Sequence, residues 1–133
     1  KSRETVFRIL DMMALYKMNV LHFHFSDDEG WRIEIPSLPE LTSVGAVRGY
    51  STDATAMLLP SYAAGPEPGK SLGTGYYSKN DFIQILKYAT ARHIQVIPEI
   101  ETPGHARAAI KSMDARYEKY IGKHRRSGAL PVA

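Results

Sequence analysis

Two clusters of ionisable side chains in this sequence have the residue types of an acid–base site. The first comprises His24, Asp27 and Asp28, and the second comprises Glu99, Glu101 and His105. Carboxyl and imidazole groups donate and accept protons efficiently near neutral pH when their surroundings shift their pKa values. If the fold brings the two clusters together, they could perform general acid and general base catalysis.

A pair of histidines offers a different chemistry. His22 and His24 are two positions apart, so a strand would place both imidazoles on one face, where they could share a divalent ion. A metal-dependent hydrolase that uses this His22-x-His24 pair is therefore one alternative. It would need further His or Asp ligands at other strand ends, because a catalytic metal usually has three protein ligands.

The histidine pair lies in a segment with the alternation of a strand, residues 20–25. One face would carry Leu21, Phe23 and Phe25, and the other would carry Val20, His22 and His24. We expect the first face to pack on helices, whereas two histidines on the second face indicate a polar interior or a site. Residues 26–31, which include both aspartates and Trp31, are predicted to form the loop that follows.

Three helices and a second strand are predicted around this segment. Helical spacing of apolar residues predicts helices at residues 4–17, from Ser78 to about Arg92, and at residues 106–120. Ser78 is the expected N-cap, with Asp81 in the capping-box position. Residues 94–100 are typical of a buried strand, followed by a polar loop at 101–105. Glycines and prolines recur between residues 45 and 78, which predicts a long loop.

The order of elements is helix, strand, long loop, helix, strand, loop and helix, which is the alternation of parallel βα units. We expect an α/β fold in which two parallel strands and their flanking helices form part of a (β/α)8 TIM barrel. The site of such a barrel is built from loops at the carboxyl ends of its strands. Both predicted strands end in an ionisable cluster, so the two clusters should face each other.

The composition excludes several classes of protein. The chain is 44% hydrophobic and 23% charged, has a net charge of +3 and contains no cysteine. These values are close to the globular average and there is no long apolar run, so no membrane partner is expected. The lack of cysteine excludes a disulfide framework and a thiol nucleophile. The basic cluster from Lys123 to Arg126 lies at a chain end, and nucleic-acid binding is not expected from it.

Two segments resemble signatures of the family 20 glycoside hydrolases. They are residues 17–32, KMNVLHFHFSDDEGWR, and residues 96–105, VIPEIETPGH. The resemblance extends from about Glu4 to Tyr120. It implies a (β/α)8 barrel that acts as a β-N-acetylhexosaminidase on glycans with terminal β-linked N-acetylglucosamine or N-acetylgalactosamine. It implies retention of configuration, and neither a cofactor nor a metal.

The resemblance also implies roles for particular residues. In substrate-assisted enzymes of this kind the 2-acetamido oxygen of the sugar is the nucleophile, a Glu is the general acid and base, and an Asp orients the acetamido group. Asp27 and His105 match family positions at which Asp, His and that Glu form a hydrogen-bonded chain. The Asp–Glu pair itself, and the Arg that grips the substrate, have no counterpart in this sequence.

Other residues are candidates for substrate binding or for support of the site: Asp28, Trp31, Glu99, Glu101 and His24. The three acidic residues could equally satisfy loop amides and neighbouring arginines. His24, with His22, is expected to fill a polar barrel interior with hydrogen bonds. Trp31 could stack on a sugar face or serve as a packing anchor.

The length has consequences for the domain organisation. Two βα units fall short of the roughly 250 residues of a complete barrel, so residues 1–133 are predicted to be a fragment of one catalytic barrel, with 121–133 a truncated or foreign tail. We expect the fragment to be inactive alone and to self-associate through open strand edges. A non-catalytic saccharide-binding or structural role is the second alternative. The usual substrates of the family imply an extracytoplasmic location, periplasmic or secreted.

Overall fold

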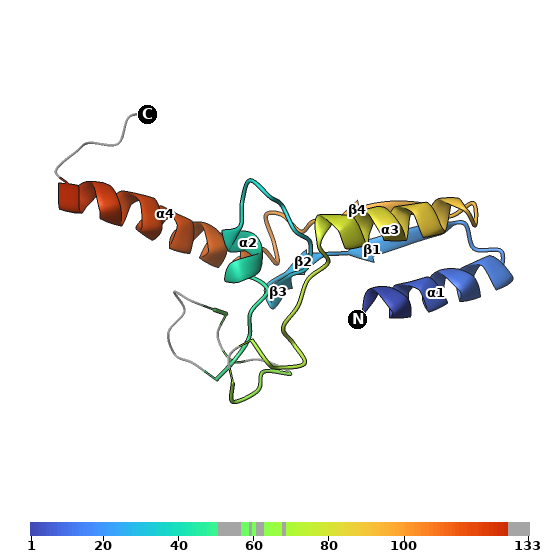
Figure 1. Cartoon of the computed structure of the whole chain (residues 1–133), viewed down its shortest axis with the longest axis horizontal. Helices are drawn as coiled ribbons and strands as arrows, with labels where there is room; N and C mark the ends of the chain where they lie inside the picture. Colours follow the sequence, from blue (N-terminus) through green and yellow to red (C-terminus); the bar gives the residue numbers. More distant parts are fainter. Residues whose placement is uncertain (51–56, 59, 61–62, 68, 128–133) are drawn as a thin grey trace.

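The computed structural model describes residues 1–50, 57–58, 60, 63–67 and 69–127, with the backbone alone for residues 122–127. Its elements are α1 (Arg3–Leu15), β1 (Val20–His24), β2 (Ser26–Asp27), β3 (Gly30–Trp31), α2 (Glu40–Ser43), α3 (Lys79–Thr90), β4 (Gln95–Glu99) and α4 (Arg107–Ser127). Figure 1 shows β1 and β4 side by side, while α4 extends away at the opposite end of the molecule. None of the described helices has both the length and the apolar character needed to cross a membrane. The basic side chains of residues 123–126 lie outside the described part.

β1 and β4 pair in parallel, with Val20 opposite Gln95 and His24 opposite Glu99. Both strands therefore end at the same edge of the sheet, as two neighbouring strands of a barrel do. Exposure alternates along β1, since Leu21 and Phe23 are partly buried while Val20, His22 and His24 are exposed. The predicted parallel pairing and the predicted division of β1 into an apolar and a polar face are both confirmed.

Helices α1 and α3 each begin directly after a serine N-cap. Ser2 caps α1 by accepting a hydrogen bond from the amide of Thr5 at 3.3 Å. Ser78 caps α3, because its Oγ accepts from the Asp81 amide at 3.0 Å while the Asp81 carboxylate accepts from the Ser78 amide at 3.2 Å. This is the capping box predicted from the sequence.

Each of these helices is joined to its strand by a left-handed residue. Lys17 after α1 has φ 57°, and His93 after α3 has φ 56°. A left-handed residue just past a helix ends the helix and redirects the chain. His93 is exposed in this turn. The two helix-to-strand connections thus share one local conformation.

The main core lies between the apolar face of β1 and helices α1 and α3. Its buried members are Val6, Leu10, Met13, Phe25, Tyr77, Ile85, Ala89 and Ile94. Phe25 is fully buried, and its ring centroid lies 4.3 Å from that of Phe23 and 5.4 Å from that of Phe82. Tilted and edge-on aromatic contacts of this kind are favourable. The core therefore anchors the chain immediately before Asp27.

Residues 26–31 form a short hairpin, so the prediction of a simple loop was wrong. Ser26 of β2 lies opposite Trp31 of β3 in antiparallel pairing. The turn is held by two guanidinium groups that donate to the carbonyl of Glu29, from Arg32 Nη2 at 3.2 Å and from Arg48 Nε at 2.7 Å. Arg48 is distant in sequence, which is why the local pattern did not reveal the hairpin.

A second apolar cluster connects the hairpin to α2 and α4. It contains Trp31, Leu41, Leu58 and Ala108. Beside it, the buried carboxylate of Glu40 accepts hydrogen bonds from Arg116 at 2.8 Å and from Lys119 at 3.0 Å. These bonds lower the pKa of Glu40 to about 2. The ionic contacts tie α2 to α4, which continues to Ser127, past the predicted end at residue 120.

Candidate active site

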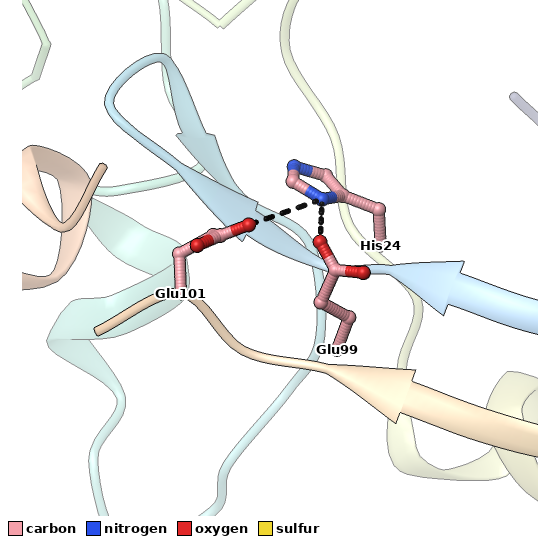
Figure 2. Close-up of side chains that lie close together, drawn as sticks. All are labelled: His24, Glu99 and Glu101. Carbon is pink, nitrogen blue, oxygen red and sulfur yellow. Dashed lines mark hydrogen bonds and ion pairs between the residues drawn. The ribbon is translucent and has the colours of Figure 1, made fainter. Parts of the chain in front are cut away.

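The carboxyl ends of β1 and β4 bring the predicted clusters together. Glu99 is the last residue of β4 and lies opposite His24 in the strand register. Its Oε1 is 2.6 Å from His24 Nδ1, and its Oε2 is 2.6 Å from His22 Nε2. Figure 2 shows Glu101 approaching the same ring nitrogen of His24 as Glu99, with an oxygen 3.9 Å from Nδ1. One carboxylate thus joins two imidazoles across the strand pair.

The charges in this group support each other. The hydrogen bond with Glu99 raises the pKa of His24, and Asp27 adds to the effect. In return, the hydrogen bond from His24 lowers the pKa of Glu99. An imidazolium between carboxylates is the arrangement that these opposite shifts favour.

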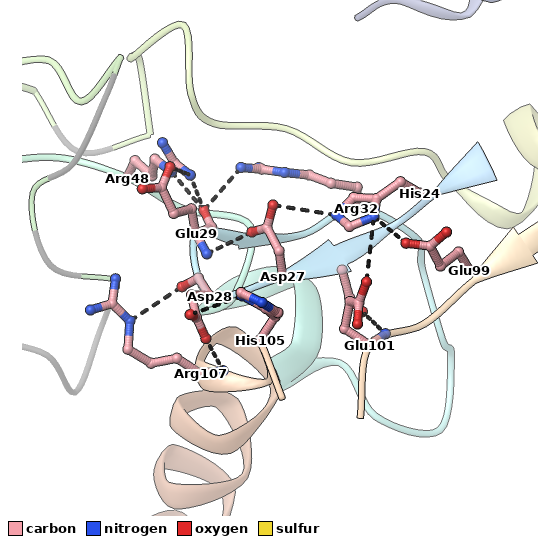
Figure 3. Close-up of polar contacts among 11 residues, drawn as sticks. His24, Asp27, Asp28, Glu29, Arg32, Arg48, Glu99, Glu101, His105 and Arg107 are labelled. Atoms are coloured by element: carbon pink, nitrogen blue, oxygen red, sulfur yellow. Dashed lines mark hydrogen bonds and ion pairs between the residues drawn. The ribbon is translucent and has the colours of Figure 1, made fainter. Parts of the chain in front are cut away.

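Asp27 and Asp28 point to different partners (Figure 3). An oxygen of Asp27 lies 3.4 Å from His24 Nε2, and its other oxygen accepts from the Glu29 amide at 2.6 Å. An oxygen of Asp28 lies 3.5 Å from His105 Nδ1. Of the two aspartates, Asp28 is the one that contacts His105 in this structure, whereas a pairing of Asp27 with His105 stays a prediction. Asp27 ends β2, whereas Asp28 lies in the turn that follows it.

Asp28 also fixes the start of α4. Its carboxylate accepts from the Arg107 amide at 3.1 Å, and its carbonyl accepts from Arg107 Nε at 3.2 Å. A carboxylate at a helix N-terminus satisfies an amide that has no partner within the helix, and it also interacts favourably with the helix dipole. This contact holds the hairpin, α4 and the preceding loop in one arrangement around His105.

His105 has an unusual backbone. Its φ is 51°, in the left-handed region that residues other than glycine seldom adopt. Its side chain is 72% exposed. Strained backbones are retained where a side chain must be aimed, as at active sites. The imidazole of His105 therefore projects from the strand-end loop with one ring nitrogen toward Asp28.

A cleft of about 690 Å³ adjoins this group of residues. It is lined by Phe23, His24 and Arg32, by residues 71–77, and by the first two residues of the chain. Arg32 donates to the Gly75 carbonyl at 2.9 Å, which ties the long loop to the hairpin. Volumes of 300–1,000 Å³ are typical of small-molecule sites. The described part of residues 45–78 contains no helix or extended strand, as predicted, and it forms one wall of the cleft.

The remaining candidates divide between the site and the packing around it. Trp31 is 7% exposed and its indole donates to the Ile33 carbonyl at 2.6 Å. It therefore serves as a packing anchor in this structure and does not present its ring to a sugar. Glu101 is partly buried, and its amide donates to the Ser26 hydroxyl at 2.9 Å. Sequence reasoning missed Arg32 and Arg48. The one available signal was that Arg32 directly follows the acidic segment.

One group within the described residues has the donor types and spacing of a metal site. Ligand atoms of His24, Glu99 and Glu101 all lie within 4.8 Å of one another. His24 and Glu99 already satisfy each other through a 2.6 Å hydrogen bond, which accounts for their proximity without an ion.

The fold and this site together define a class of protein. Parallel βα units whose strands end at one edge in carboxylates and imidazoles are typical of (β/α)8 barrel enzymes, which carry their sites at that edge. Carboxyl and imidazole groups in contact are suited to proton transfer and to the orientation of an acid.

Comparison with known proteins gives the family. Residues 1–130 match the model of glycosyl hydrolase family 20, catalytic domain. An N,N′-diacetylchitobiase of Vibrio harveyi is 55% identical over 120 residues, which are 90% of this chain and 14% of that protein. A β-hexosaminidase of Vibrio vulnificus is 52% identical over 122 residues, 92% of this chain and 14% of that relative. The chain belongs to glycosyl hydrolase family 20, which confirms the predicted resemblance.

Solved structures agree. The chain superimposes on a family 20 exo-β-N-acetylglucosaminidase of Vibrio harveyi in complex with N-acetylglucosamine with a TM-score of 0.75 and 43% identity, covering 86% of this chain and 17% of that one. The predicted fold class, part of a (β/α)8 barrel, is confirmed. The chain spans about one seventh of the length of the relatives it matches. The family match includes most of residues 121–133, and the origin of that segment stays a prediction.

Proposed function

We propose that this chain forms part of the catalytic domain of a β-N-acetylhexosaminidase, which releases terminal β-linked N-acetylglucosamine or N-acetylgalactosamine with retention. Membership of family 20 and the activities in the names of its relatives support the proposal. The observation that carries it is the convergence of Asp28 on His105, and of Asp27 and Glu99 on His24, at one edge of the strand pair. This family membership also favours the glycosidase over a metal-dependent hydrolase.

The proposed mechanism is substrate-assisted. The acetamido oxygen of the sugar attacks its own anomeric carbon while a Glu of the complete barrel protonates the departing oxygen, and an Asp beside that Glu orients the acetamido group. Asp28 holds one ring nitrogen of His105, and we propose that the other faces this Glu. A histidine in this position orients the acid and adjusts its pKa for proton transfer near neutral pH.

The 133-residue chain alone is proposed to be inactive, since the Asp–Glu pair has no counterpart in its sequence. The test is hydrolysis of a chromogenic β-N-acetylglucosaminide by this chain and by the complete enzyme that contains it. We expect turnover only by the complete enzyme, lowered at least about tenfold by Asp27→Asn, Asp28→Asn or His105→Asn. Asparagine suits position 105 because it tolerates a left-handed backbone.

Two outcomes would contradict this proposal. Hydrolysis by the 133-residue chain would mean that the missing pair is not the catalytic pair. Binding of N-acetylglucosamine by the complete protein without any turnover would favour the non-catalytic, saccharide-binding alternative. Glu118→Gln serves as the matched control, because it removes one exposed carboxylate of α4 far along the helix from His105.

Two further expectations belong to the same proposal. The sheet has the order β1–β4, and within the described residues each strand has one unpaired edge. Open edges pair readily with other chains, so we propose that the isolated chain self-associates; sedimentation that shows a monomer at high concentration would contradict this. We also propose an extracytoplasmic location, periplasmic or secreted, because the proposed substrates, glycans with terminal N-acetylhexosamines, are usually found there. Activity confined to the cytoplasm after cell fractionation would argue against it.

A further inference from the structure

Glu99 contacts two histidines of the site and takes no part in the Asp28–His105 contact. It ends β4, and its side chain lies on the same face of the sheet as His22 and His24. Both of its oxygens are engaged at 2.6 Å, one by each imidazole. Figure 3 shows Glu99 on one side of His24 and Asp27 on the other. The geometry thus forms a chain from Glu99 through His24 to Asp27.

The contacts determine where the protons of His24 lie. The Glu99 carboxylate can only accept a hydrogen bond, so Nδ1 must carry a proton. The opposite nitrogen, Nε2, lies 3.4 Å from an oxygen of Asp27, which is also an acceptor when ionised. A favourable contact on both sides requires both ring nitrogens to be protonated. The pKa of His24 is raised accordingly, chiefly by the hydrogen bond with Glu99.

The orientation of Asp27 depends on this chain. One of its oxygens accepts from the Glu29 amide at 2.6 Å, so the hairpin fixes that side. The other oxygen has the imidazolium of His24 as its partner. If His24 lost its charge, the second contact would lose most of its strength, and the Asp27 carboxylate could rotate about its remaining bond.

We propose that Glu99 is a positioning residue for the hydrolysis, which holds His24 as a cation and through it fixes the carboxylate of Asp27 beside the cleft. The inference rests on the proposed function and adds to it a second acid–histidine pair, next to Asp28 and His105. Glu99 acts through His24 and does not itself touch the substrate.

Other charged and titratable groups surround His24 and set the size of the effect. They are Glu99 on β4, Glu101 just after it and Asp27 on β2, with His22 of β1 on the other oxygen of Glu99. Lys1, Arg32, Tyr76 and Tyr77 line the cleft that His24 also lines. Removing the charge of Glu99 leaves Asp27 and Glu101 near the imidazole. We therefore expect the pKa of His24 to fall while the group still titrates.

The test measures kcat and KM of the complete enzyme on a chromogenic β-N-acetylglucosaminide from about pH 4 to about pH 9. Glu99→Gln keeps the size of the side chain and removes its charge. We expect a loss in kcat of about 10- to 100-fold at neutral pH, with little change in KM, because a misplaced group costs rate more than affinity. As the pH falls and His24 regains its proton, kcat should recover toward the wild-type value.

Two further variants make the result decisive. His24→Gln should lower kcat without recovery at acid pH, because no imidazole remains to be protonated. Glu118→Gln should follow the wild-type profile. The thermal midpoints of all three should stay within about 2 °C of wild type.

The outcomes separate the inference from the function on which it rests. An unchanged kcat profile in Glu99→Gln, or a loss that is equal at every pH and accompanied by a lower thermal midpoint, would overturn the positioning role while leaving the hydrolase intact. Absence of hydrolysis by the unsubstituted complete enzyme would overturn the proposed function, and the positioning role with it.

Discussion

The two faces of β1 differ in how their side chains are stabilised. On one face Phe23 continues into the buried Phe25, and both pack against aromatic rings and helices. On the other face His22 and His24 are 62% and 49% exposed and are held by ionic contacts to one residue of β4. Burial of apolar side chains stabilises the first face, whereas contacts on the second face orient ionisable side chains for catalysis.

This difference shows how a single strand can serve two purposes. Exposed ion pairs contribute little to stability because water screens them and because two side chains must be ordered. Their value lies in orientation. We therefore expect substitutions on the apolar face to change the free energy of unfolding, and substitutions on the polar face to change catalysis in the complete enzyme.

The largest expected effect comes from the apolar face. Phe25→Ala should lower the free energy of unfolding by about 3–5 kcal/mol, because it leaves a cavity among three aromatic rings. Urea unfolding of the dilute chain, followed by far-UV circular dichroism, measures the change. His22→Ala on the opposite face should stay within about 0.5 kcal/mol of wild type. Comparable losses of unfolding free energy in the two variants would contradict the proposed difference between the two faces.

A smaller effect should come from the second apolar cluster. A Cβ at residue 45 would lie 2.6 Å from the Leu41 carbonyl oxygen and 2.6 Å from Ser112 Oγ. Gly45→Ala should therefore lower the free energy of unfolding by about 1–3 kcal/mol through overpacking. Gly104→Ala is the matched control, since nothing lies within 4 Å of a Cβ there. If both variants unfold alike, the contact between the hairpin and α4 is looser than described.

The smallest expected effect is a pH dependence at the α2–α4 contact. Hydrogen bonds from Arg116 and Lys119 lower the pKa of Glu40 from 4.5 to about 2. The carboxylate therefore adds stability that is complete above about pH 4.5 and is lost as the pH falls through about 2. The difference in unfolding free energy between wild type and Glu40→Gln should shrink across this window. A difference independent of pH, as expected for Glu118→Gln, would exclude the ionic contact as its source.

Much of the fold could be predicted because its signals are local. The alternation of residues 20–25 determines which side chains of β1 are buried, and Ser78 with Asp81 defines the start of α3. Helix–strand alternation and the two ionisable clusters were sufficient to place the site at one edge of a parallel pair.

The parts that could not be predicted depend on contacts between distant residues. The hairpin at residues 26–31 is held by Arg48, whose position depends on the long loop. Asp28 lies in the turn of this hairpin and contacts both His105 and the start of α4, which are distant in sequence. The bridge from Glu99 to His22 and His24 follows from the strand register, which places Glu99 opposite His24.

The measurement that tests the account most directly is a double-mutant cycle on Asp28 and His105 in the complete enzyme. We expect Asp28→Asn and His105→Asn each to lower kcat at least about tenfold with little change in thermal midpoint. We also expect the fold-loss in kcat of the double variant to be far smaller than the product of the two single fold-losses, because the residues act as one unit. If the fold-loss in kcat of the double variant equals the product of the two single losses, the catalytic role of this strand edge is contradicted. A wild-type kcat in either single variant would contradict it too.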